Sequence, residues 1–407
     1  MSERLYYNDP SLTSFDATVA ELTSLQERRV AVVLDRTAFY PTSGGQPFDT
    51  GVLRAEGAEF RVVDVVDREA DGAIVHIVES ATRTQELLRP GVAAHGEIDV
   101  ERRRDHMQQH SGQHVLSAAF VRLFDMPTVS FHLGDESCSI DVAAESLTGD
   151  QLRRAEELAN YVVTDDRPVE IRYASVEQAR EMGLRKLPPR SGEIRLIDIH
   201  DFDLTACGGT HVHRTGQIGV ILLRKREKVK QGTRVEFLCG ARAVRASRAD
   251  YETLTEAAEL FSGHPRELAA LVRKSNDELK SAGKMQQKLL EQIAEYEARE
   301  LLGAAEQQPS IRLVLKTYSD RDSNYAKLMA RKLSAAPGVV AVIASAAPQP
   351  TVVMACAPDV ELDCGAILKA AMAAAGGRGG GTPQMAQGGV AHPANLAAAM
   401  ARIRESL

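Results

Sequence analysis

One stretch of the sequence carries three regularly spaced histidines: His106-Met107-Gln108-Gln109-His110-Ser111-Gly112-Gln113-His114. It falls within an expected helix that runs from near Arg102 to about Phe124 and is followed by Pro127. Residues four apart lie on the same face of a helix, so the three imidazoles are close enough to share a metal ion. No glutamate stands between the last two histidines as a general base, which makes a metallopeptidase a poor alternative.

A second stretch places sulfur and nitrogen at the same spacing: Cys207-Gly208-Gly209-Thr210-His211. Thiolate and imidazole together favour zinc over hard cations such as magnesium, so we expect one Zn²⁺ per chain. The simplest set of ligands is His110, His114, Cys207 and His211. That choice leaves His106 and His213 as nearby polar residues, and a swap with either stays open.

The ligand count leaves the role of the metal open. Four protein ligands make a closed, structural zinc site, whereas a catalytic site keeps one position for water or substrate. Gly208 and Gly209 favour a binding pocket, because another backbone or a substrate can approach the metal closely where no side chain stands.

The N-terminal segment, residues 1–92, is expected to form a small β-barrel. Its short strands alternate with glycine and charged turns, and they include residues 29–34, 60–66 and 73–78. Between the first strands lies a polar loop, residues 35–47, that contains two adjacent glycines. A tight hairpin is the simpler interpretation of this loop, but its many special residues favour a functional role as well.

The fold class that these patterns predict is α+β with several domains. A length of 407 residues corresponds to two or three domains. After the barrel we expect an α/β zinc-binding core over residues 93–240 and a long helical hairpin or coiled coil over residues 241–304. Polar residues interrupt the apolar seam of the second long helix, so a coiled coil would be broken. A small α/β domain is expected over residues 305–407.

Composition and charge exclude several classes of protein. With 44% hydrophobic and 26% charged residues, the chain is typical of globular rather than disordered proteins. A net charge of −7 argues against a uniformly basic coat for nucleic acid, so contacts with RNA must be local. The chain lacks a run of eighteen apolar residues and a signal peptide, so we expect a cytoplasmic protein that uses no membrane. Five scattered cysteines do not resemble a disulfide framework.

Taken together, the motifs resemble the stand-alone alanyl-tRNA editing proteins of the long AlaX type, which are related to the editing and C-terminal domains of alanyl-tRNA synthetase. The resemblance covers nearly the whole chain. Besides the histidine helix and the cysteine motif, it rests on residues 39–41, 44–46, 49–51, 185–188, 376–381 and 386–389. The aminoacylation half is absent, so the resemblance implies an editor that acts in trans.

The activity implied by the resemblance is a zinc-dependent ester hydrolysis. Its substrate would be Ser-tRNA(Ala), with Gly-tRNA(Ala) as a second candidate. Selection by binding alone is worth only ~1–3 kcal/mol for one methyl or hydroxyl group, so a second, hydrolytic sieve has a physical purpose. Zinc would either position the aminoacyl group or activate water, and the sequence does not choose between these roles.

The resemblance also implies residues that line the pocket: Gly44, Gly45, Gln46, Gly208, Gly209 and Thr210. Two positions depart from the synthetase pattern, because Gln113 precedes the second helix histidine and His132 stands on the following strand. Gln46, Gln113 and His132 are therefore the candidate catalytic residues. His132 could donate a hydrogen bond or act as general acid, and a surface histidine on a strand is an equal alternative.

Three groups of basic residues are candidates for contact with tRNA. The stretch from Arg214 to Arg234 is locally basic, and Arg185 and Lys186 add to it, although a solvated strand face is the ordinary interpretation. Arg378 lies in a glycine-rich stretch that resembles the C-terminal domain which helps to bind tRNA and often joins subunits, so a homodimer is a further expectation. The lysine of a P-loop is missing, so ATP binding is not expected for catalysis.

Two other classes compete with the hydrolase. The first is a zinc-containing tRNA-binding protein without activity. The second is a phosphoesterase that shares the C-terminal domain type, which would need an Asp-His-His cluster and further aspartates for two metals. Asp105-His106-Met107 does not supply that cluster, so the hydrolase leads.

Overall fold

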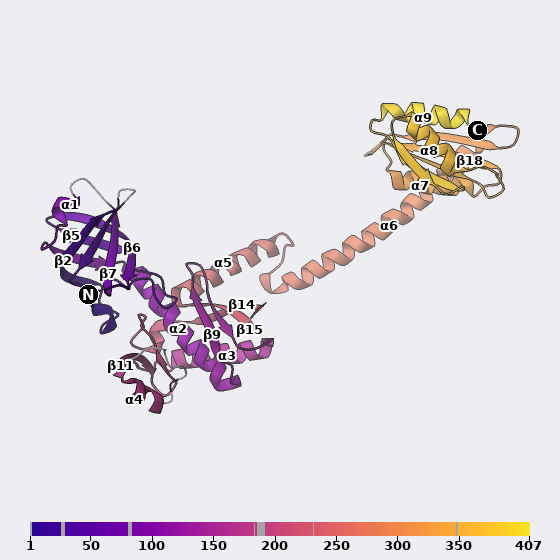
Figure 1. The fold of residues 1–407 in the computed structure, drawn as a ribbon. Coiled ribbons are helices and arrows are strands. Elements are labelled where there is room, and N and C mark those ends of the chain that lie inside the picture. The colour runs from indigo at the N-terminus through magenta and orange to yellow at the C-terminus, as the bar shows by residue number, and fades with distance from the viewer. Residues whose placement is uncertain are drawn as a thin grey trace. The chain divides into compact units, whose positions relative to one another are not determined.

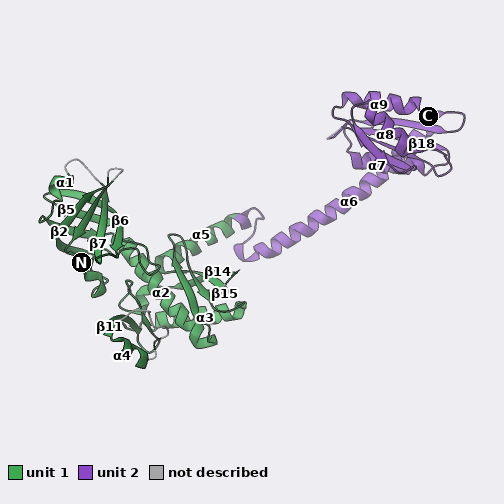
Figure 2. Ribbon diagram, viewed as in Figure 1, with its two compact units in different colours: residues 1–256 green, residues 257–407 purple. Residues whose placement is uncertain are grey.

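The computed structural model describes residues 2–25, 29–79, 84–182, 184, 192–230, 232–346 and 349–407. The chain divides into two compact units, residues 1–256 and residues 257–407, with the boundary inside a helix (Figure 2). The finer division into four segments that the sequence indicates therefore stays a prediction.

The first unit begins with a closed six-stranded barrel, as the sequence predicts (Figure 1). Its strands follow the order β2 (Ser14–Ser24), β3 (Arg29–Leu34), β7 (Ala73–Glu79), β6 (Ala58–Arg68), β5 (Gly51–Ala55) and β8 (Ala93–Ile98). Alternate residues point inward and are buried, among them Val19, Val32 and Leu53. Short elements accompany the barrel: β1 (Glu3–Arg4), the 3-10 turn η1 (Leu5–Tyr7), β4 (Arg36–Thr37) and α1 (Thr84–Leu87).

The central helix of the first unit is α2 (Val100–Phe124). Asp99 caps its start, because the carboxylate accepts the backbone N–H groups of Glu101 and Arg102 at 3.1 Å. The helix ends at Asp125, which adopts a left-handed conformation with φ 54°. Residues 109–120 are buried on all sides, so α2 is a core helix rather than an amphipathic surface helix.

Two antiparallel sheets and two helices surround α2. The four-stranded sheet has the order β14 (Ile221–Val229), β15 (Gly232–Cys239), β10 (Cys138–Val142) and β9 (Thr128–Leu133). The three-stranded sheet has the order β11 (Val169–Ala174), β12 (Ile194–Ile199) and β13 (Asp203–Ala206). Helices α3 (Gly149–Thr164) and α4 (Val176–Glu181), and the 3-10 turn η2 (Thr215–Ile218), complete this part. Side chains of α2, α3 and both sheets share one hydrophobic core.

Helix α5 (Gly240–Glu259) follows β15 and contains the boundary between the units. The second unit continues after α5 with the 3-10 turn η3 (Pro265–Glu267) and the long helix α6 (Leu268–Gly303), which lie within the helical segment expected over residues 241–304. Apolar side chains of the predicted seam are exposed, among them Leu279 at 73% and Tyr296 at 72%. The coiled coil and the helical hairpin stay predictions.

The rest of the second unit is a mixed sheet covered by helices. The sheet has the order β16 (Glu306–Gln307), β17 (Arg312–Tyr318), β18 (Val339–Ser345), β19 (Thr351–Cys356), β21 (Met385–Gly389) and β20 (Arg378–Gly381). Only β17 and β18 run parallel among the described pairs. The helices are α7 (Ser323–Ser334), α8 (Cys364–Ala374) and α9 (Ala394–Glu405). Across the described ranges of both units, no helix combines the length and apolar character of a membrane span.

Candidate metal centre

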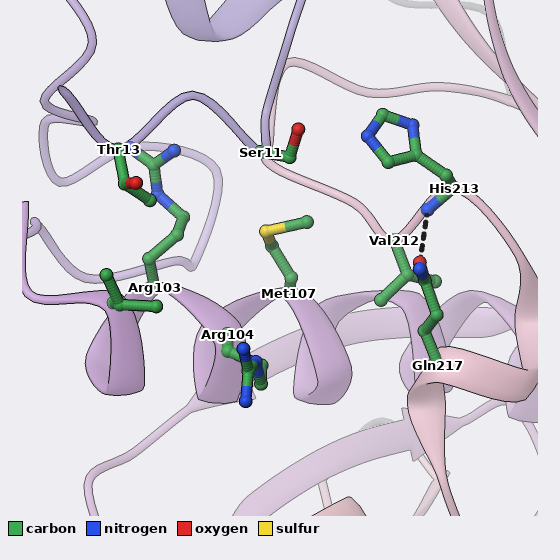
Figure 3. A pocket seen from close by; sticks show the side chains of 9 residues that line it. Ser11, Thr13, Arg103, Arg104, Met107, Val212, His213 and Gln217 are labelled. Carbon is green, nitrogen blue, oxygen red and sulfur yellow. Dashed lines mark hydrogen bonds between the residues drawn. The ribbon is translucent and has the colours of Figure 1, made fainter. Parts of the chain in front are cut away.

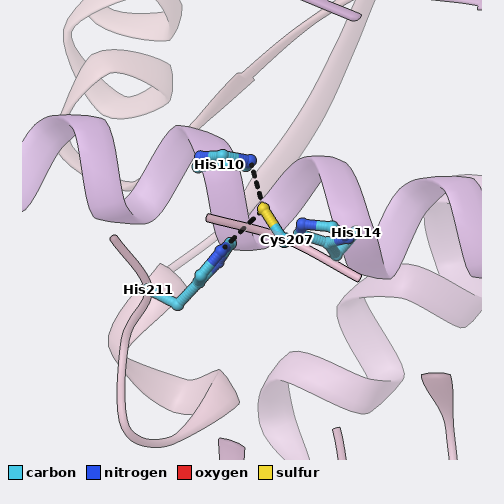
Figure 4. A group of neighbouring side chains, drawn as sticks. All are labelled: His110, His114, Cys207 and His211. Atoms are coloured by element: carbon cyan, nitrogen blue, oxygen red, sulfur yellow. Dashed lines mark hydrogen bonds between the residues drawn. The ribbon is translucent and has the colours of Figure 1, made fainter. Parts of the chain in front are cut away.

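Four side chains from two separate segments converge in the first unit. Helix α2 carries His110 and His114, and the loop after β13 carries Cys207 and His211 (Figure 4). The Cys207 Sγ atom lies 3.3 Å from His110 Nε2 and 3.3 Å from His211 Nε2. One ligand atom from each of the four residues lies within 4.8 Å of the others. The structure therefore brings together the four ligands that the sequence predicts.

The geometry of this group fits a tetrahedral metal ion. Zinc bonds of 2.0–2.1 Å to nitrogen and 2.3 Å to sulfur imply ligand separations of ~3.3–3.6 Å. The two nitrogen–sulfur distances of 3.3 Å lie at the lower end of that range. The three histidines are buried, whereas Cys207 is partly exposed, so the group opens toward solvent at the cysteine.

Gln46 fixes the orientation of the first histidine. The Nδ1–H of His110 donates to Gln46 Oε1 at 2.8 Å, which directs the other ring nitrogen toward the cysteine. The same amide binds the cysteine loop, because its Nε2 donates to Thr210 Oγ1 at 2.8 Å and its Oε1 accepts from the Thr210 backbone N–H at 3.1 Å. Gln46 is fully buried. It therefore joins the glycine loop of the barrel, helix α2 and the cysteine motif.

Polar groups also face the outer nitrogens of the other two histidines. His211 Nδ1 lies 3.3 Å from Ser111 Oγ, which in turn accepts the Val212 backbone N–H at 3.1 Å. His114 Nδ1 lies 3.8 Å from a carboxylate oxygen of Asp203. The contact with Ser111 selects the tautomer of His211 that leaves its inner nitrogen available to a metal, and the Asp203 carboxylate lies on the outer side of His114.

Arg195 of β12 holds the backbone of the cysteine loop. Its Nη1 donates to the carbonyl oxygens of Cys207 at 2.7 Å and Gly209 at 3.0 Å, and its Nε donates to the carbonyl of Tyr7 at 3.1 Å. Arg195 is not among the residues that the sequence predicts for the site. The available signal was a single arginine inside the apolar strand of residues 194–199, where a charged side chain needs a specific partner.

The two glycines of the cysteine motif differ in their surroundings. A Cβ atom at Gly209 would lie 2.2 Å from Cε1 of His110, so this position accepts no side chain. At Gly208 the nearest atom would be the Tyr7 hydroxyl at 3.7 Å, an ordinary contact. In the barrel loop, Gly44 and Gly45 have φ angles of 58° and 86°, which favour glycine. Of the two glycines in the cysteine motif, Gly209 is thus the one that must lack a side chain, because it lies against His110.

Burial keeps His110 and His211 in the neutral form, in which each ring carries a single N–H. Desolvation, with a smaller contribution from the Arg195 cation, lowers the pKa of His110 to about 3. Desolvation also lowers the pKa of His211 well below its ordinary value, and the neighbouring histidines act in the same direction. At neutral pH both rings are neutral, which is the form that binds a metal.

Two of the three candidate catalytic residues are not brought to the ligand group. His132 lies exposed on β9, and the preceding residue Phe131 points to the opposite side, where its ring centroid is 5.3 Å from that of His110. The alternation of side chains along β9 thus places His132 on the solvent side. This agrees with the alternative prediction of a surface histidine on a strand. Gln113 is buried, but its amide donates along α2 to Ser117 Oγ at 2.8 Å. Among the described hydrogen bonds of these three side chains, that of Gln46 with His110 reaches a ligand.

A buried ion pair, which the sequence does not predict, attaches the barrel to α2. Arg103 of α2 and Asp49 of the barrel loop have side chains that are 2% and 0% exposed, with 2.5 Å between Nη2 and Oδ2. The same guanidinium donates to the carbonyls of Pro10 at 2.7 Å and Ala38 at 2.5 Å. Asp49 also accepts the backbone N–H of Tyr40 at 2.7 Å. These contacts hold the loop that carries Gln46 against α2.

The basic stretch from Arg214 to Arg234 is largely neutralised by partners. Its ion pairs are Arg214 with Asp166, Arg224 with Asp250, Lys225 with Glu227, Lys228 with Glu145 and Arg234 with Asp141. This pairing favours the solvated strand face. Arg185 and Lys186 lie outside the described residues. Arg378 is exposed at the start of β20, an edge strand of the second unit.

Comparisons with known families match three segments of the chain. Residues 2–102 match the family "tRNA synthetases class II (A)", residues 194–236 match the "Threonyl and Alanyl tRNA synthetase second additional domain", and residues 312–407 match the "DHHA1 domain". The second match ends three residues before β15 does and includes the whole cysteine motif.

Relatives of known name match almost the whole chain. The alanine–tRNA ligase of Thermococcus kodakarensis is 32% identical over 99% of this chain, which spans only 43% of that ligase. The ligase of Natronomonas pharaonis is 33% identical over 95% of this chain and 42% of its own length. A solved structure, the C-Ala domain of Aquifex aeolicus alanyl-tRNA synthetase, is 19% identical over 25% of this chain and 95% of its own, with a TM-score of 0.23, too low to decide anything about the fold.

One relative agrees in length as well as in sequence. The alanyl-tRNA editing protein AlaX-L of Pyrococcus horikoshii is 31% identical over 96% of this chain and 95% of its own length. The match therefore includes the barrel, the converging ligands and the C-terminal unit together. The chain belongs to the AlaX-L family of alanyl-tRNA editing proteins.

Proposed function

We propose that this protein hydrolyses the ester bond between a wrong amino acid and the 3′-terminal ribose of tRNA(Ala). Ser-tRNA(Ala) is the proposed substrate, with Gly-tRNA(Ala) as a second one. One zinc ion per chain would be held by His110, His114, Cys207 and His211. The protein would act in trans, on a tRNA charged by a separate synthetase.

The observation that carries this proposal is the convergence of the four ligand atoms beside a glycine loop. All four lie within 4.8 Å of one another, and Gln46 of that loop hydrogen-bonds both His110 and Thr210. The partly exposed Cys207 and the exposed Gly208 leave one side of the group open to a substrate. The AlaX-L relative supports the reaction class, because its name describes alanyl-tRNA editing.

The contribution of the chain's own residues is to hold and orient. A bound zinc ion would supply Lewis acidity, either to position the aminoacyl group or to activate water. Gln46 and Ser111 would keep the ligating rings in one tautomer, and Arg195 would fix the carbonyls of the cysteine loop. Gly209 would let that loop lie against His110.

Selection against alanine would rest on a hydroxyl group in the pocket. Thr210 is fully buried, and its Oγ1 accepts a hydrogen bond from the Gln46 amide, which leaves its O–H to donate elsewhere. A serine side chain could accept that hydrogen bond, whereas alanine offers no partner and would leave the buried hydroxyl unpaired. Thr210 is therefore the proposed residue that favours serine.

Contacts with the rest of the tRNA are proposed outside the metal centre. Arg185, Lys186 and the glycine-rich strand that begins at Arg378 would bind the RNA backbone. The C-terminal unit would also join two chains into a homodimer. Each of these roles is tested by tRNA affinity and by molecular mass in solution, for a variant in which the named basic residue is replaced by alanine.

A panel of three esters tests the proposed activity. Serine, glycine and alanine are attached to tRNA(Ala), and their release is followed with and without the protein. We expect fast release of serine, release of glycine, and an alanine ester that survives. Equal release of all three would remove the selectivity that we assign to the pocket, and no release would contradict the hydrolase.

The second candidate is a zinc-containing tRNA-binding protein without activity. One observation favours it, because four protein ligands already complete a tetrahedron, as in structural zinc sites. Under this alternative the protein binds one zinc ion and tRNA(Ala) but releases no amino acid. The same panel therefore separates the two candidates.

A further inference from the structure

A cavity in the first unit lies close to the ligand group but is not part of it. It has a volume of about 430 Å³ and lies between residues 11–13, the N-terminal half of α2 and the loop that follows His211 (Figure 3). None of the four ligands is among the residues that line it. Its size falls in the usual range of ~300–1,000 Å³ for small-molecule sites.

The lining combines an apolar floor with donors at the edge. Met107 and Val212 are buried and form the floor, while Arg104, His213 and Thr13 supply polar groups (Figure 3). No acidic side chain is among the lining residues. One carboxylate stands near the rim: Asp9, which accepts from the Ser11 backbone N–H at 2.9 Å and lies 3.9 Å from His213 Nε2. The end of the cavity at Arg104 is therefore the end that suits an anion.

Arg104 differs from the arginines beside it. Arg102 donates to the Phe48 carbonyl at 3.0 Å, and Arg103 is buried in its pair with Asp49. Arg104 is exposed, and within the described ranges its guanidinium makes neither a hydrogen bond nor an ion pair. A charge that is not used by the fold is available to a ligand.

The walls of the cavity are fixed before any ligand enters. The buried guanidinium of Arg103 holds the carbonyl of Pro10 at 2.7 Å, next to the segment that forms one wall. On the other wall, the His213 backbone N–H donates to Gln217 Oε1 at 2.9 Å, the dashed line in Figure 3. The backbone groups are thus already paired, and mainly side chains remain to contact a ligand. A preformed pocket saves the entropy of ordering on binding.

The N-terminal segment contacts the surroundings of the ligand group at one end and lines the cavity at the other. Near the metal, the Tyr7 carbonyl accepts from Arg195, and the Tyr7 hydroxyl faces Gly208. Two residues further on, Asp9 faces His213 across the same line. The next residues of the N-terminal segment then line the cavity together with Val212. A chain-like ligand whose end lies at the ligand group would pass along the outside of these contacts to reach the cavity.

We propose that the cavity binds the nucleotide that precedes the terminal one at the 3′ end of the tRNA. Its base would lie on Met107 and Val212, with the His213 ring beside it, and a backbone phosphate would meet Arg104. This assignment rests on the proposed function, since it takes the aminoacyl end to be at the metal. It adds a binding site for RNA that lies apart from the basic stretch.

Two kinds of probe test this assignment on the full, zinc-loaded chain. Binding is measured with the RNA trinucleotide CCA carrying a 5′-phosphate. Turnover is measured on three serine esters of increasing length: seryl-adenosine, seryl-CCA and seryl-tRNA(Ala). The variant is Arg104→Ala. The matched control is Arg153→Ala, an exposed arginine of α3 whose partner is Asp150 on the same helix.

We expect Arg104→Ala to bind the trinucleotide about tenfold more weakly, the size of one charge-assisted contact. The slope of log affinity against log salt should fall by about 0.7, the value for one phosphate of a single strand. For seryl-CCA and seryl-tRNA(Ala), Arg104→Ala should raise KM and leave kcat unchanged. For seryl-adenosine, both KM and kcat should equal those of the wild type. Arg104→Lys should recover part of the affinity, and Arg153→Ala should behave as the wild type.

Two results would overturn the assignment. One is trinucleotide binding that Arg104→Ala leaves unchanged. The other is an equal loss on all three esters, because that would mean that Arg104 supports α2 and its ligands. Failure of the proposed function looks different: no ester is hydrolysed by the wild type, while trinucleotide binding and its dependence on Arg104 can still be read.

Discussion

Gln46 is the residue on which the two halves of the metal centre meet. Its amide orients His110 and binds Thr210, so a single side chain positions ligands from α2 and from the cysteine loop. Outer partners of this kind tune affinity without touching the metal. The arrangement of the ligands therefore depends on the hydrogen bonds behind them as much as on the ligands themselves.

Replacing Gln46 by alanine should weaken zinc binding by about 10- to 100-fold, because His110 loses the acceptor of its Nδ1–H. The affinity is measured by competition with a chelator of known strength. Gln113→Ala is the matched control. Its amide is also buried and lies on α2 with His110, but it donates to Ser117. An affinity equal to the wild type in Gln46→Ala would remove this residue from the metal centre.

The two glycines of the cysteine motif should respond differently to alanine. Gly209→Ala places a Cβ atom 2.2 Å from the His110 ring, so the loop or the ring must move and the zinc content and ester hydrolysis should fall strongly. Gly208→Ala meets only the Tyr7 hydroxyl at 3.7 Å and should retain bound zinc. Zinc per chain in the two purified variants decides this. Equal losses would show that the loop is held in another way.

At the scale of elements, the junction between the barrel and α2 depends on a buried ion pair. Breaking such a pair by removing one partner costs about 3–5 kcal/mol, because the other charge stays buried. Asp49→Ala should therefore lower the free energy of unfolding of the first unit by about that amount. The measurement is unfolding of the full chain in urea, followed by a signal from the first unit. Asp150→Ala breaks an exposed pair with Arg153 and should cost less than about 1 kcal/mol. Similar losses in both variants would contradict the importance of the junction.

The barrel contains a histidine that makes its stability depend on pH. His76 is buried, its Nδ1–H donates to the Val32 carbonyl at 3.0 Å, and its Nε2 accepts from Thr37 at 2.8 Å. Desolvation lowers the pKa of His76 from 6.5 to about 4. The folded state thus binds a proton at His76 less readily than the unfolded state does. Protonation of His76 therefore costs the folded state no stability above pH 6.5 and destabilises it as the pH falls toward 4.

As the pH falls from 6.5 to 4, the barrel should lose about 3 kcal/mol of stability through His76. The measurement is the free energy of unfolding at several pH values for the wild type and for His76→Phe. The variant should show a flatter dependence over this range, although its stability at pH 7 is lower. Parallel curves would place the pH dependence in other groups.

The elements also separate what the sequence could predict from what it could not. The ligands were predictable because four-residue spacing on a helix and in a short loop is a local property. Arg195 and the pair of Arg103 with Asp49 depend on partners far away in the sequence, which periodicity does not reveal. The side on which His132 lies depends on the phase of β9, and a shift of one residue exchanges the two faces.

For the whole molecule, a net charge of −7 must be reconciled with the proposed RNA partner. The basic stretch from Arg214 to Arg234 is largely paired with carboxylates, so attraction at long range is weak and individual contacts must carry the affinity. The two units are each well packed, with separate cores. Binding of tRNA should consequently depend on salt through few phosphate contacts rather than through a broad basic surface.

The central claim is that the four ligands hold a zinc ion that is required for ester hydrolysis. The most direct measurement determines zinc content and release of serine from Ser-tRNA(Ala) on the same samples of wild type and Cys207→Ala, before and after removal of metal and addition of zinc. We predict one zinc ion per wild-type chain, activity that disappears with the metal and returns with it, and little of either in the variant. Unchanged turnover in metal-free wild type or in Cys207→Ala would contradict the claim.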